Sequence, residues 1–282
     1  MYKTRKSFFY FFSFLLLINC SGNVGETTEK NNSNSDIIVD KENIRVTKHF
    51  DFESKTYYYL TKIEHKDESG NLLKLRHAHA NSDSGETVPN FAKRMDNPLV
   101  AINASMGRSN LPPDITKPSG IQIIDGVVIQ DLPKSVKRNT LGIKDNNELV
   151  AYPPDITAQD ILDDGVKNAL SAFTTLIEDH ESVPENVLTW VGNYSVKHPR
   201  QVIAQFDNRD LLIFSCGGRG YDGTGMTAKD VIRILKEQGV KFAFMLDGGG
   251  SVSTVVLGEL ITKKIDQHGT QDRPRPNFLY VK

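Results

Sequence analysis

Short apolar runs separated by turn residues recur along the chain, and they predict a fold rich in β-strands. Several of the runs alternate apolar and polar residues or are flanked by Gly, Asn and Asp, which is typical of strands joined by tight turns. Five such runs fall in the first half of the chain, at 56–65, 72–80, 98–105, 120–131 and 140–152. A further run at 200–216 predicts a hairpin.

Turn residues place the predicted hairpins. The sequence DG at 125–126 divides one run and DNN at 145–147 divides another, so each of these runs should fold back on itself. Residues 66–71, KDESGN, are expected to join the first two runs as a hairpin. The run 98–105 predicts a buried strand that ends at Asn103.

The strongest helix signal lies at residues 227–239. Thr227 can cap its first turn, and Asp230 stands three residues later, where it can return the hydrogen bond. Gly239 suits the C-terminal stop. The apolar residues recur at helical spacing and form one face: Ala228, Val231, Ile232 and Leu235.

Residues 157–181 are expected to be partly helical, with Thr157 as a possible N-cap and Gly165 as a breaker. Residues 241–246, KFAFML, predict a strand that is buried on both faces. The fold class that follows is α+β. We expect a mixed, strand-rich single domain over residues 44–282, with a few helices packed on the sheet.

The N-terminus predicts an export signal. Residues 1–19 combine early basic residues with an apolar stretch of signal-peptide length, and LINC at 17–20 resembles the lipobox of a bacterial lipoprotein. We therefore expect a signal peptide at 1–19, lipid on Cys20, and a flexible linker over 20–43. The protein would be an exported lipoprotein, membrane-anchored through its lipid and facing the periplasm or cell exterior. A plain secretory signal is the alternative.

The composition of the chain argues against a nucleic-acid partner and excludes little else. The 282 residues carry a formal net charge of −1 and are 38% hydrophobic, which is ordinary for a globular protein. Near-neutral charge argues against nucleic-acid binding. The chain has two cysteines, so Cys216 lacks a disulfide partner if Cys20 carries lipid. Because Cys216 ends an apolar run, we interpret it as a small buried residue rather than a nucleophile.

The stretch FMLDGGGSVSTVV at 244–256 is the first candidate site. Asp247 stands at the end of a buried strand, where ligands often bind in layered folds. Glycines allow a sharp turn and a close approach of backbone N–H groups to an anion, phosphate above all. The residues that follow Asp247 are Gly248, Gly249, Gly250 and Ser251. The alternative is a glycine-rich turn that Asp247 caps.

A second glycine-rich segment, CGGRGYDGTGMT at 216–227, strengthens the prediction. It contains Gly218 and Arg219, and the guanidinium fork suits a pair of phosphate oxygens. Arg200 is a second candidate for the same task. The alternative for each arginine is a surface salt bridge.

These motifs together resemble the phosphodiester glycosidase family, which includes N-acetylglucosamine-1-phosphodiester alpha-N-acetylglucosaminidase. The matching segments occur in family order over roughly residues 57–282, and the LDGGGS and GR…GMT blocks are the specific ones. The segments are 100–106, 118–130, 198–205, 217–239, 244–256 and 273–282.

The resemblance implies hydrolysis of a sugar-1-phosphodiester with release of free sugar. Asp247 would then activate water or stabilise the oxocarbenium-like centre, with Asp222 as the less favoured carboxylate. The leaving phosphate would be held by Arg219, Arg200 and the glycine N–H groups of Gly218 and 248–250. Asn103 and Ser251 would orient sugar hydroxyls or phosphate oxygens.

Several alternatives stay open at this point. No cofactor is required, but Asp247 and nearby carbonyls could hold a structural calcium ion. His77 and His79 have a spacing compatible with a metal and are otherwise ordinary surface residues. The protein could also be a non-catalytic surface lipoprotein that binds sugar phosphates, or a metal-dependent phosphodiesterase. Residues 153–198 are the segment least matched to any motif, and shaping the cleft is a role left open for them.

Overall fold

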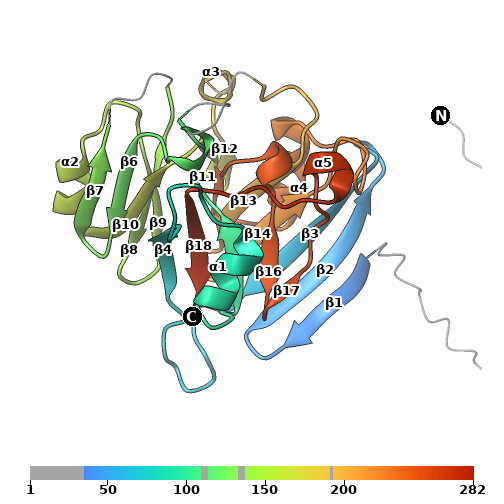
Figure 1. Cartoon of the computed structure of the whole chain (residues 1–282), viewed down its shortest axis with the longest axis horizontal. Coiled ribbons are helices and arrows are strands. Elements are labelled where there is room, and N and C mark those ends of the chain that lie inside the picture. The colour runs from blue at the N-terminus through green and yellow to red at the C-terminus, as the bar shows by residue number, and fades with distance from the viewer. Residues whose placement is uncertain (1–34, 109–113, 133–136, 191–192) are drawn as a thin grey trace, which may run out of the picture. The chain divides into compact units, whose positions relative to one another are not determined.

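Three antiparallel sheets carry the fold in the computed structural model, which describes residues 35–108, 114–132, 137–190 and 193–282 (Figure 1). The eight-stranded central sheet has the order β1 (Ser35–Lys41), β2 (Ile44–Asp51), β3 (Thr56–Ile63), β14 (Leu211–Cys216), β13 (Arg200–Gln205), β15 (Phe242–Met245), β11 (Thr174–Glu178) and β12 (Glu181–Ser182). The C-terminal sheet has the order β17 (Glu259–Leu260), β16 (Thr254–Val256), β5 (Val100–Asn103), β18 (Asn277–Val281) and β4 (Leu75–His79). The side sheet has the order β7 (Val127–Asp131), β6 (Ile121–Ile124), β10 (Val166–Ser171), β8 (Thr140–Lys144) and β9 (Leu149–Tyr152).

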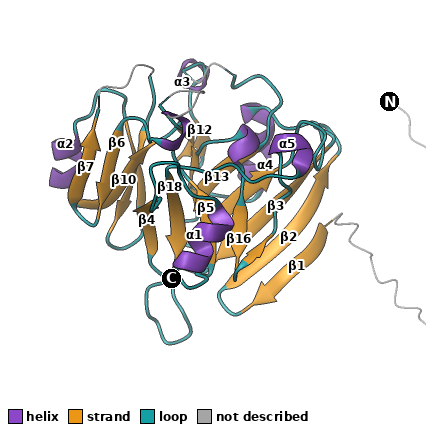
Figure 2. Cartoon of the chain, in the orientation of Figure 1, coloured by secondary structure: helices purple, strands orange, loops and turns teal. Residues whose placement is uncertain are grey.

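Short helices lie against these sheets (Figure 2). The α-helices of the described residues are α1 (Val88–Arg94), α2 (Ala158–Asp163), α3 (Glu185–Leu188), α4 (Ala228–Glu237) and α5 (Asp266–Gly269). Two single 3₁₀ turns, η1 (Asp114–Thr116) and η2 (Gly249–Ser251), complete the set. The expectation of a strand-rich single domain with few helices is confirmed, and every pairing between its described strands is antiparallel.

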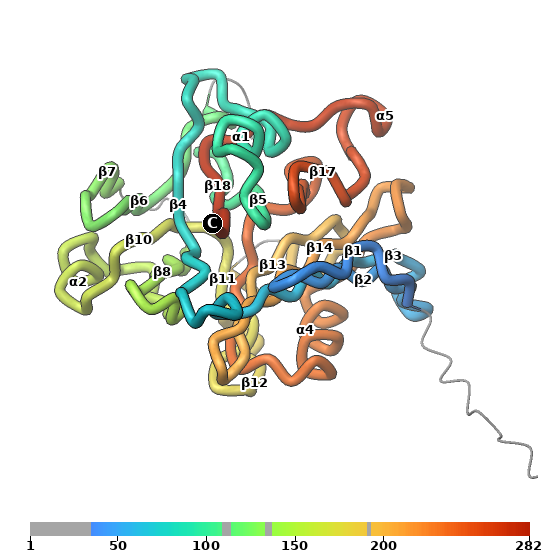
Figure 3. The backbone as a smooth tube through the Cα atoms, turned by 90° about the horizontal axis from the view of Figure 1, so that it is seen from below, coloured from blue at the N-terminus to red at the C-terminus, as the bar shows by residue number. Residues whose placement is uncertain are grey.

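The main core lies between the central sheet and the C-terminal sheet, and apolar residues of the side sheet, such as Leu141 and Leu170, join it. Alternate residues of β18 show how the layers divide, because successive side chains on a strand point to opposite faces. Leu279 and Val281 join the main core, while Phe278 and Tyr280 pack with Phe91 of α1 on the outer face. On the other side, α4 covers the outer face of the central sheet, so the layers run α1, sheet, sheet, α4 (Figure 3).

Local sequence signals account for α4. Thr227 accepts a hydrogen bond from the Asp230 backbone amide, and the Asp230 carboxylate accepts from the Thr227 backbone amide, which completes the predicted capping box. The predicted apolar face is buried against the central sheet. Gly239, at φ +73, follows the helix end as expected.

Two sequence predictions hold only in part, because long-range pairing decides the rest. Residues 66–71 turn the chain locally, with Lys66 bridged to Leu72, but β3 and β4 do not pair, since they belong to different sheets and β4 pairs with β18. Thr157 caps α2 and Gly165 follows its end, as expected, but α2 ends at Asp163 and strands β10 and β11 make up most of 157–181. Their β-branched and apolar residues find partners in distant strands. The hairpins at 120–131, 140–152 and 200–216 are confirmed.

The N-terminal boundary differs from the expected one. Residues 1–34, with the predicted signal peptide and the lipidation site Cys20, lie outside the described residues. The linker was expected to reach residue 43, but Ser35–Lys41 already forms β1 and pairs with β2. The sheet therefore begins inside the range that polar composition had assigned to the linker. Among the described residues, no helix has the length and apolar character needed to cross a membrane.

Candidate active site

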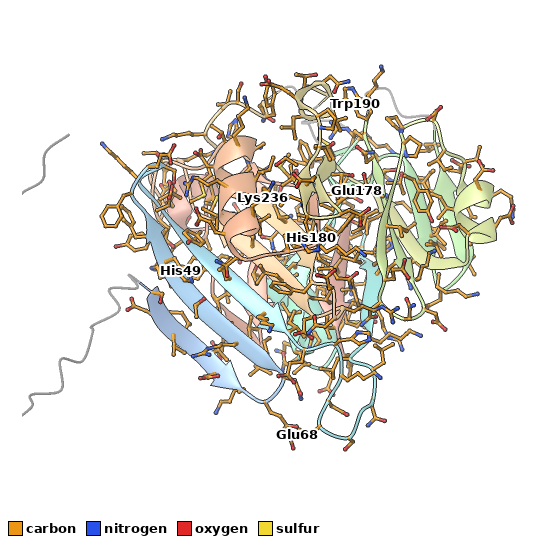
Figure 4. The ribbon with its side chains drawn as sticks, turned by 180° about the vertical axis from the view of Figure 1, so that it is seen from behind. His49, Glu68, Glu178, His180, Trp190 and Lys236 are labelled. Carbon is orange, nitrogen blue, oxygen red and sulfur yellow. The ribbon has the colours of Figure 1, made fainter. Side chains whose placement is uncertain are left out.

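A cavity of about 550 Å³ opens where strand ends from two sheets meet, a volume suited to a small ligand. It is lined from the end of β15, the start of β13, the segment before β18, and the loops after β5 and β14. Trp190 also lines it, and Figure 4 shows this residue at the end of the molecule opposite Glu68. The site thus gathers segments that are far apart in sequence.

Asp247 is held rigidly at this cavity. Its Oδ2 forms an ion pair with Arg275 Nη2 at 2.6 Å, and Arg275 is only 1% exposed. The Asp247 amide donates to the Ala104 carbonyl at 2.9 Å, and the Asp247 carbonyl accepts from Asn103 Nδ2 at 2.7 Å. The carboxylate therefore faces the cavity from a backbone that is anchored on both sides.

The glycines after Asp247 are required by what packs against them. Gly249 has φ +63, and a Cβ there would lie 2.9 Å from Arg219 Nη2. A Cβ on Gly250 would collide with the Asp266 carboxylate. The Gly249 amide donates to the Pro199 carbonyl at 2.9 Å, so this N–H group is not free to hold phosphate as expected. The glycines therefore serve mainly to let the Arg219 and Asp266 side chains approach the backbone, rather than to present free N–H groups to an anion.

Five arginines line the cavity, and we call them the arginine cluster: Arg138, Arg200, Arg219, Arg273 and Arg275. Asp266 pairs with two of them. Arg273 donates from Nε to Asp266 Oδ2 at 2.5 Å and from Nη2 to Asp266 Oδ1 at 2.8 Å. Arg219 Nη1 lies 3.8 Å from the same Oδ1. Guanidinium groups are the side chains best shaped for phosphate oxygens, so the cavity is built for an anion.

His198 is a further lining residue that could exchange a proton. Burial, together with the positive charges of Arg200 and Arg219, lowers the pKa of His198 below its ordinary value. The imidazole is therefore neutral at physiological pH and can accept a proton as well as donate one.

The structure brings only some of the predicted residues to the cavity. Asp247, Arg219, Arg200, Gly248 and Gly249 line it. The predicted residues outside its lining are Asp222, Asn103, Gly218, Gly250 and Ser251.

Asp222 lies away from the cavity, where its carboxylate accepts from the Tyr59 hydroxyl at 2.6 Å and lies 3.7 Å from Lys48 Nζ. Asn103 is fully buried, and both polar atoms of its side chain bind backbone: Nδ2 as above, and Oδ1 accepting from the Ser253 amide at 3.1 Å. It positions Asp247 rather than facing a ligand. Gly218 is needed because a Cβ there would collide with Pro199.

Sequence reasoning missed several lining residues, chiefly Arg138, Arg273, Arg275, His198 and Trp190. Arg273 and Arg275 stand in the segment 273–282, which was recognised as a family strand but not as part of the site. The signal that could have found them is charge, because two arginines next to a buried strand need an anionic partner.

The residues near Asp247 do not suit the calcium ion that the sequence left open. The Asp247 carboxylate pairs with Arg275, and its carbonyl already accepts from Asn103. The surrounding arginine cluster adds positive charge, which disfavours a cation. A calcium site needs several free oxygen ligands, and this arrangement does not offer them.

His77 lies in a buried polar network instead of a metal site. Its Nδ1 donates to the Ile123 carbonyl at 3.1 Å, which leaves Nε2 to accept from Asn277 Nδ2 at 3.0 Å. Asn277 Oδ1 in turn accepts from the Ser105 amide at 2.8 Å, next to the loop that lines the cavity. Among the described residues, no group of three or more His, Cys, Asp and Glu side chains is placed to hold a metal.

This network predicts a pH dependence of stability. Burial, with a smaller contribution from the charge of His79, lowers the pKa of His77 to about 3. Because the folded state keeps the neutral form, its stabilisation is complete above the ordinary pKa near 6.5 and is lost as pH falls towards 3. Below about pH 6 the free energy of unfolding should drop by roughly 1.4 kcal/mol per pH unit from this residue. Urea unfolding from pH 7.5 to 4.5 measures the drop.

The control for this prediction is His77→Gln, which keeps amide hydrogen-bonding groups but cannot titrate. Its stability curve should be flatter between pH 6.5 and 5, by about 1.6 kcal/mol over that interval. Parallel curves for the two proteins would show that His77 is not the residue responsible.

Solved structures share this fold. The catalytic domain of zebrafish N-acetylglucosamine-1-phosphodiester alpha-N-acetylglucosaminidase, auto-inhibited by its pro-peptide, superimposes with a TM-score of 0.68 and 20% identity, covering 89% of this chain and 84% of that chain. A hypothetical protein from Synechocystis matches with a TM-score of 0.58 and 16% identity, over 85% of this chain and 62% of that chain. Likeness at such identities establishes the architecture.

Sequence comparison identifies the protein family, which structural similarity alone does not. The phosphodiester glycosidase family model matches residues 96–282, and the chain belongs to this family. A relative in Bacillus subtilis strain 168, the SPbeta prophage-derived uncharacterized protein YomE, is 33% identical over 184 residues. That alignment spans 64% of this chain but only 28% of YomE. The family resemblance indicated by the motifs is confirmed.

Proposed function

We propose that this protein is an exported glycoside hydrolase that cleaves a sugar-1-phosphodiester of the N-acetylglucosamine-1-phosphate type and releases free sugar. Its substrates would lie on envelope or extracellular glycans, and lipid on Cys20 would anchor the enzyme to a membrane. One observation carries the proposal: the Asp247 carboxylate, paired with Arg275 at 2.6 Å, faces a cavity that the arginine cluster lines. Family membership supports the same reaction.

The chemistry follows from the leaving group. Most glycosidases need an acid to protonate a poor alkoxide. A phosphate monoester can leave as an anion, because its second pKa is near ~6 and guanidinium groups can hold the developing charge. Arg219 and Arg273 face the cavity and are suited to this task. A separate general acid is then not needed at the leaving oxygen.

The carboxylate has the remaining task at the sugar. Asp247 would take a proton from water or stabilise positive charge at the anomeric carbon. The neutral His198 imidazole, in the same cavity, is a second group able to accept that proton. Trp190 offers an aromatic face on which a sugar ring can lie.

Product analysis tests the proposal. A soluble form that begins at Asn34 would be incubated with a simple N-acetylglucosamine-1-phosphodiester, with and without a chelator. Free sugar is expected in both cases, with the phosphate left on the other product. Sugar phosphate as the product would show that the P–O bond to the other group is cut instead of the C–O bond at the anomeric carbon, and the protein would be a phosphodiesterase. Saturable binding without turnover would make it a binding protein.

A further inference from the structure

The active cavity carries more positive charge than one phosphodiester neutralises. The arginine cluster contributes five guanidinium groups, and the carboxylates of Asp247 and Asp266 offset two of them. Within the part of the chain that the structure describes, Arg138 and Arg200 form no ion pair. The cavity therefore keeps an excess of three positive charges, whereas a phosphodiester brings one negative charge.

Arg200 is explained without a ligand. Its Nε donates to the Met226 carbonyl at 2.9 Å, and its Nη2 donates to the carbonyls of Asn193 and Val196 at 2.8 and 2.7 Å. The guanidinium joins two loops at the cavity wall. Its charge still acts on whatever binds, but most of its hydrogen bonds are already made.

Arg138 has no such explanation. Its Nη1 is buried and has no hydrogen-bond partner among the described residues, although the side chain lines the cavity. The guanidinium lies 4.9 Å from the centroid of the Phe173 ring, which holds it by a cation–π contact. An unpaired buried donor is unfavourable unless a partner arrives, so this arginine is placed in advance for an anion.

Space for a longer anionic ligand adjoins the site. A second cavity, of about 910 Å³, shares Ile115 and Arg273 with the first. Its lining includes Thr116, Gln267 and Gln271, whose polar groups can bind hydroxyls and amides. A ligand held at the arginine cluster can therefore extend past Arg273 into this second space.

We propose that Arg138 binds a second phosphoryl group of the substrate, an inference that rests on the proposed function. The substrate is then a sugar joined to a diphosphate, of the nucleoside diphosphate sugar class. Its two negative charges match the excess better than one does. Hydrolysis breaks the bond between the anomeric carbon and the phosphate oxygen and forms a C–OH bond from water. The nucleoside diphosphate leaves as an anion, and the water proton passes through Asp247 to solvent.

Binding of inorganic ions tests this inference without any turnover. Calorimetric titrations with pyrophosphate and with orthophosphate would compare the wild type with Arg138→Met. Loss of the charge-assisted contact should weaken pyrophosphate binding by about tenfold to a hundredfold and orthophosphate binding by less than about threefold. Arg45→Met, an exposed arginine paired with Asp40 at 3.7 Å, is the matched control for net charge and should change neither. Equal weakening of both ions by Arg138→Met would overturn the inference.

Steady-state kinetics provide a second test of the inference. UDP-N-acetylglucosamine and methyl N-acetylglucosamine-1-phosphate would be compared as substrates. For Arg138→Met we expect a fall in kcat/KM of roughly tenfold to a hundredfold on the first, mainly through KM, and a small change on the second. An equal change on both would overturn the inference and leave the proposed function standing. If pyrophosphate binding depends on Arg138 but neither donor is hydrolysed, the second phosphoryl site stands and the proposed function is overturned.

Discussion

Asp247→Asn is expected to lower the rate of sugar release by about 10²–10⁴-fold. Asparagine has nearly the same shape, but it cannot take a proton or stabilise a developing positive charge. The substitution leaves the arginine cluster in place to bind the phosphate, so KM should change less than kcat. The measurement is the steady-state rate of free-sugar release by the two proteins.

The comparison variant for that experiment is Asp222→Asn. The sequence offered both aspartates as candidates, but Asp222 accepts from Tyr59 at 2.6 Å and does not line the cavity. We expect its activity to stay within about threefold of the wild type, as for substitutions outside a site. Loss of activity in Asp222→Asn with retention in Asp247→Asn would exchange the two assignments. Asp247→Asn also removes the charge opposite Arg275, so both variants must be assayed well below their melting temperatures.

Arg275→Met should produce the largest loss of stability. The arginine is 1% exposed and lies 2.6 Å from a carboxylate that is itself nearly buried. Removing one partner leaves the other charge buried without compensation, which costs about 3–5 kcal/mol. For a domain of this size the melting temperature should fall by roughly 6–20 °C. Thermal and urea unfolding measure the change.

The double variant with Arg275→Met and Asp247→Asn separates this cause from simple loss of packing. If the unpaired carboxylate is responsible, adding Asp247→Asn should restore part of the lost stability, and the two effects will not be additive. Strict additivity would mean that the pair does not stabilise the fold and that the methionine only disturbs packing.

Local signals were sufficient for the elements whose partners are close in sequence. Thr227 and Asp230 identify α4, and the turn at 125–126 identifies the β6–β7 hairpin, because each signal and its response lie within a few residues. The strands within residues 166–178 were not predicted, for the opposite reason. Their partners, in β8 and β15, are not visible in a local window, and tertiary pairing overrode the weak helical pattern.

The residues of the candidate site likewise separate into those that a local motif reveals and those whose partners are distant in sequence. Asp247 and its glycines could be found because one short motif contains them. Arg138 and Arg275 could not, because each acts on a group far away in the chain: Arg275 meets Asp247, and Arg138 stacks on Phe173. The sequence also placed Asn103 on the ligand, whereas burial places it beneath Asp247.

The position of β18 has a consequence for the order of events during biosynthesis. β18 lies between β5 and β4, which are made some 170 residues or more earlier and do not pair with each other. Both must wait for residues 277–281, and such high contact order slows folding. Arg275 arrives on the same segment, so Asp247 meets its counter-charge only when this sheet closes. A nascent chain that stops before this segment therefore leaves Asp247 without its counter-charge, and the wall of the cavity is complete only after the segment before β18 has been made.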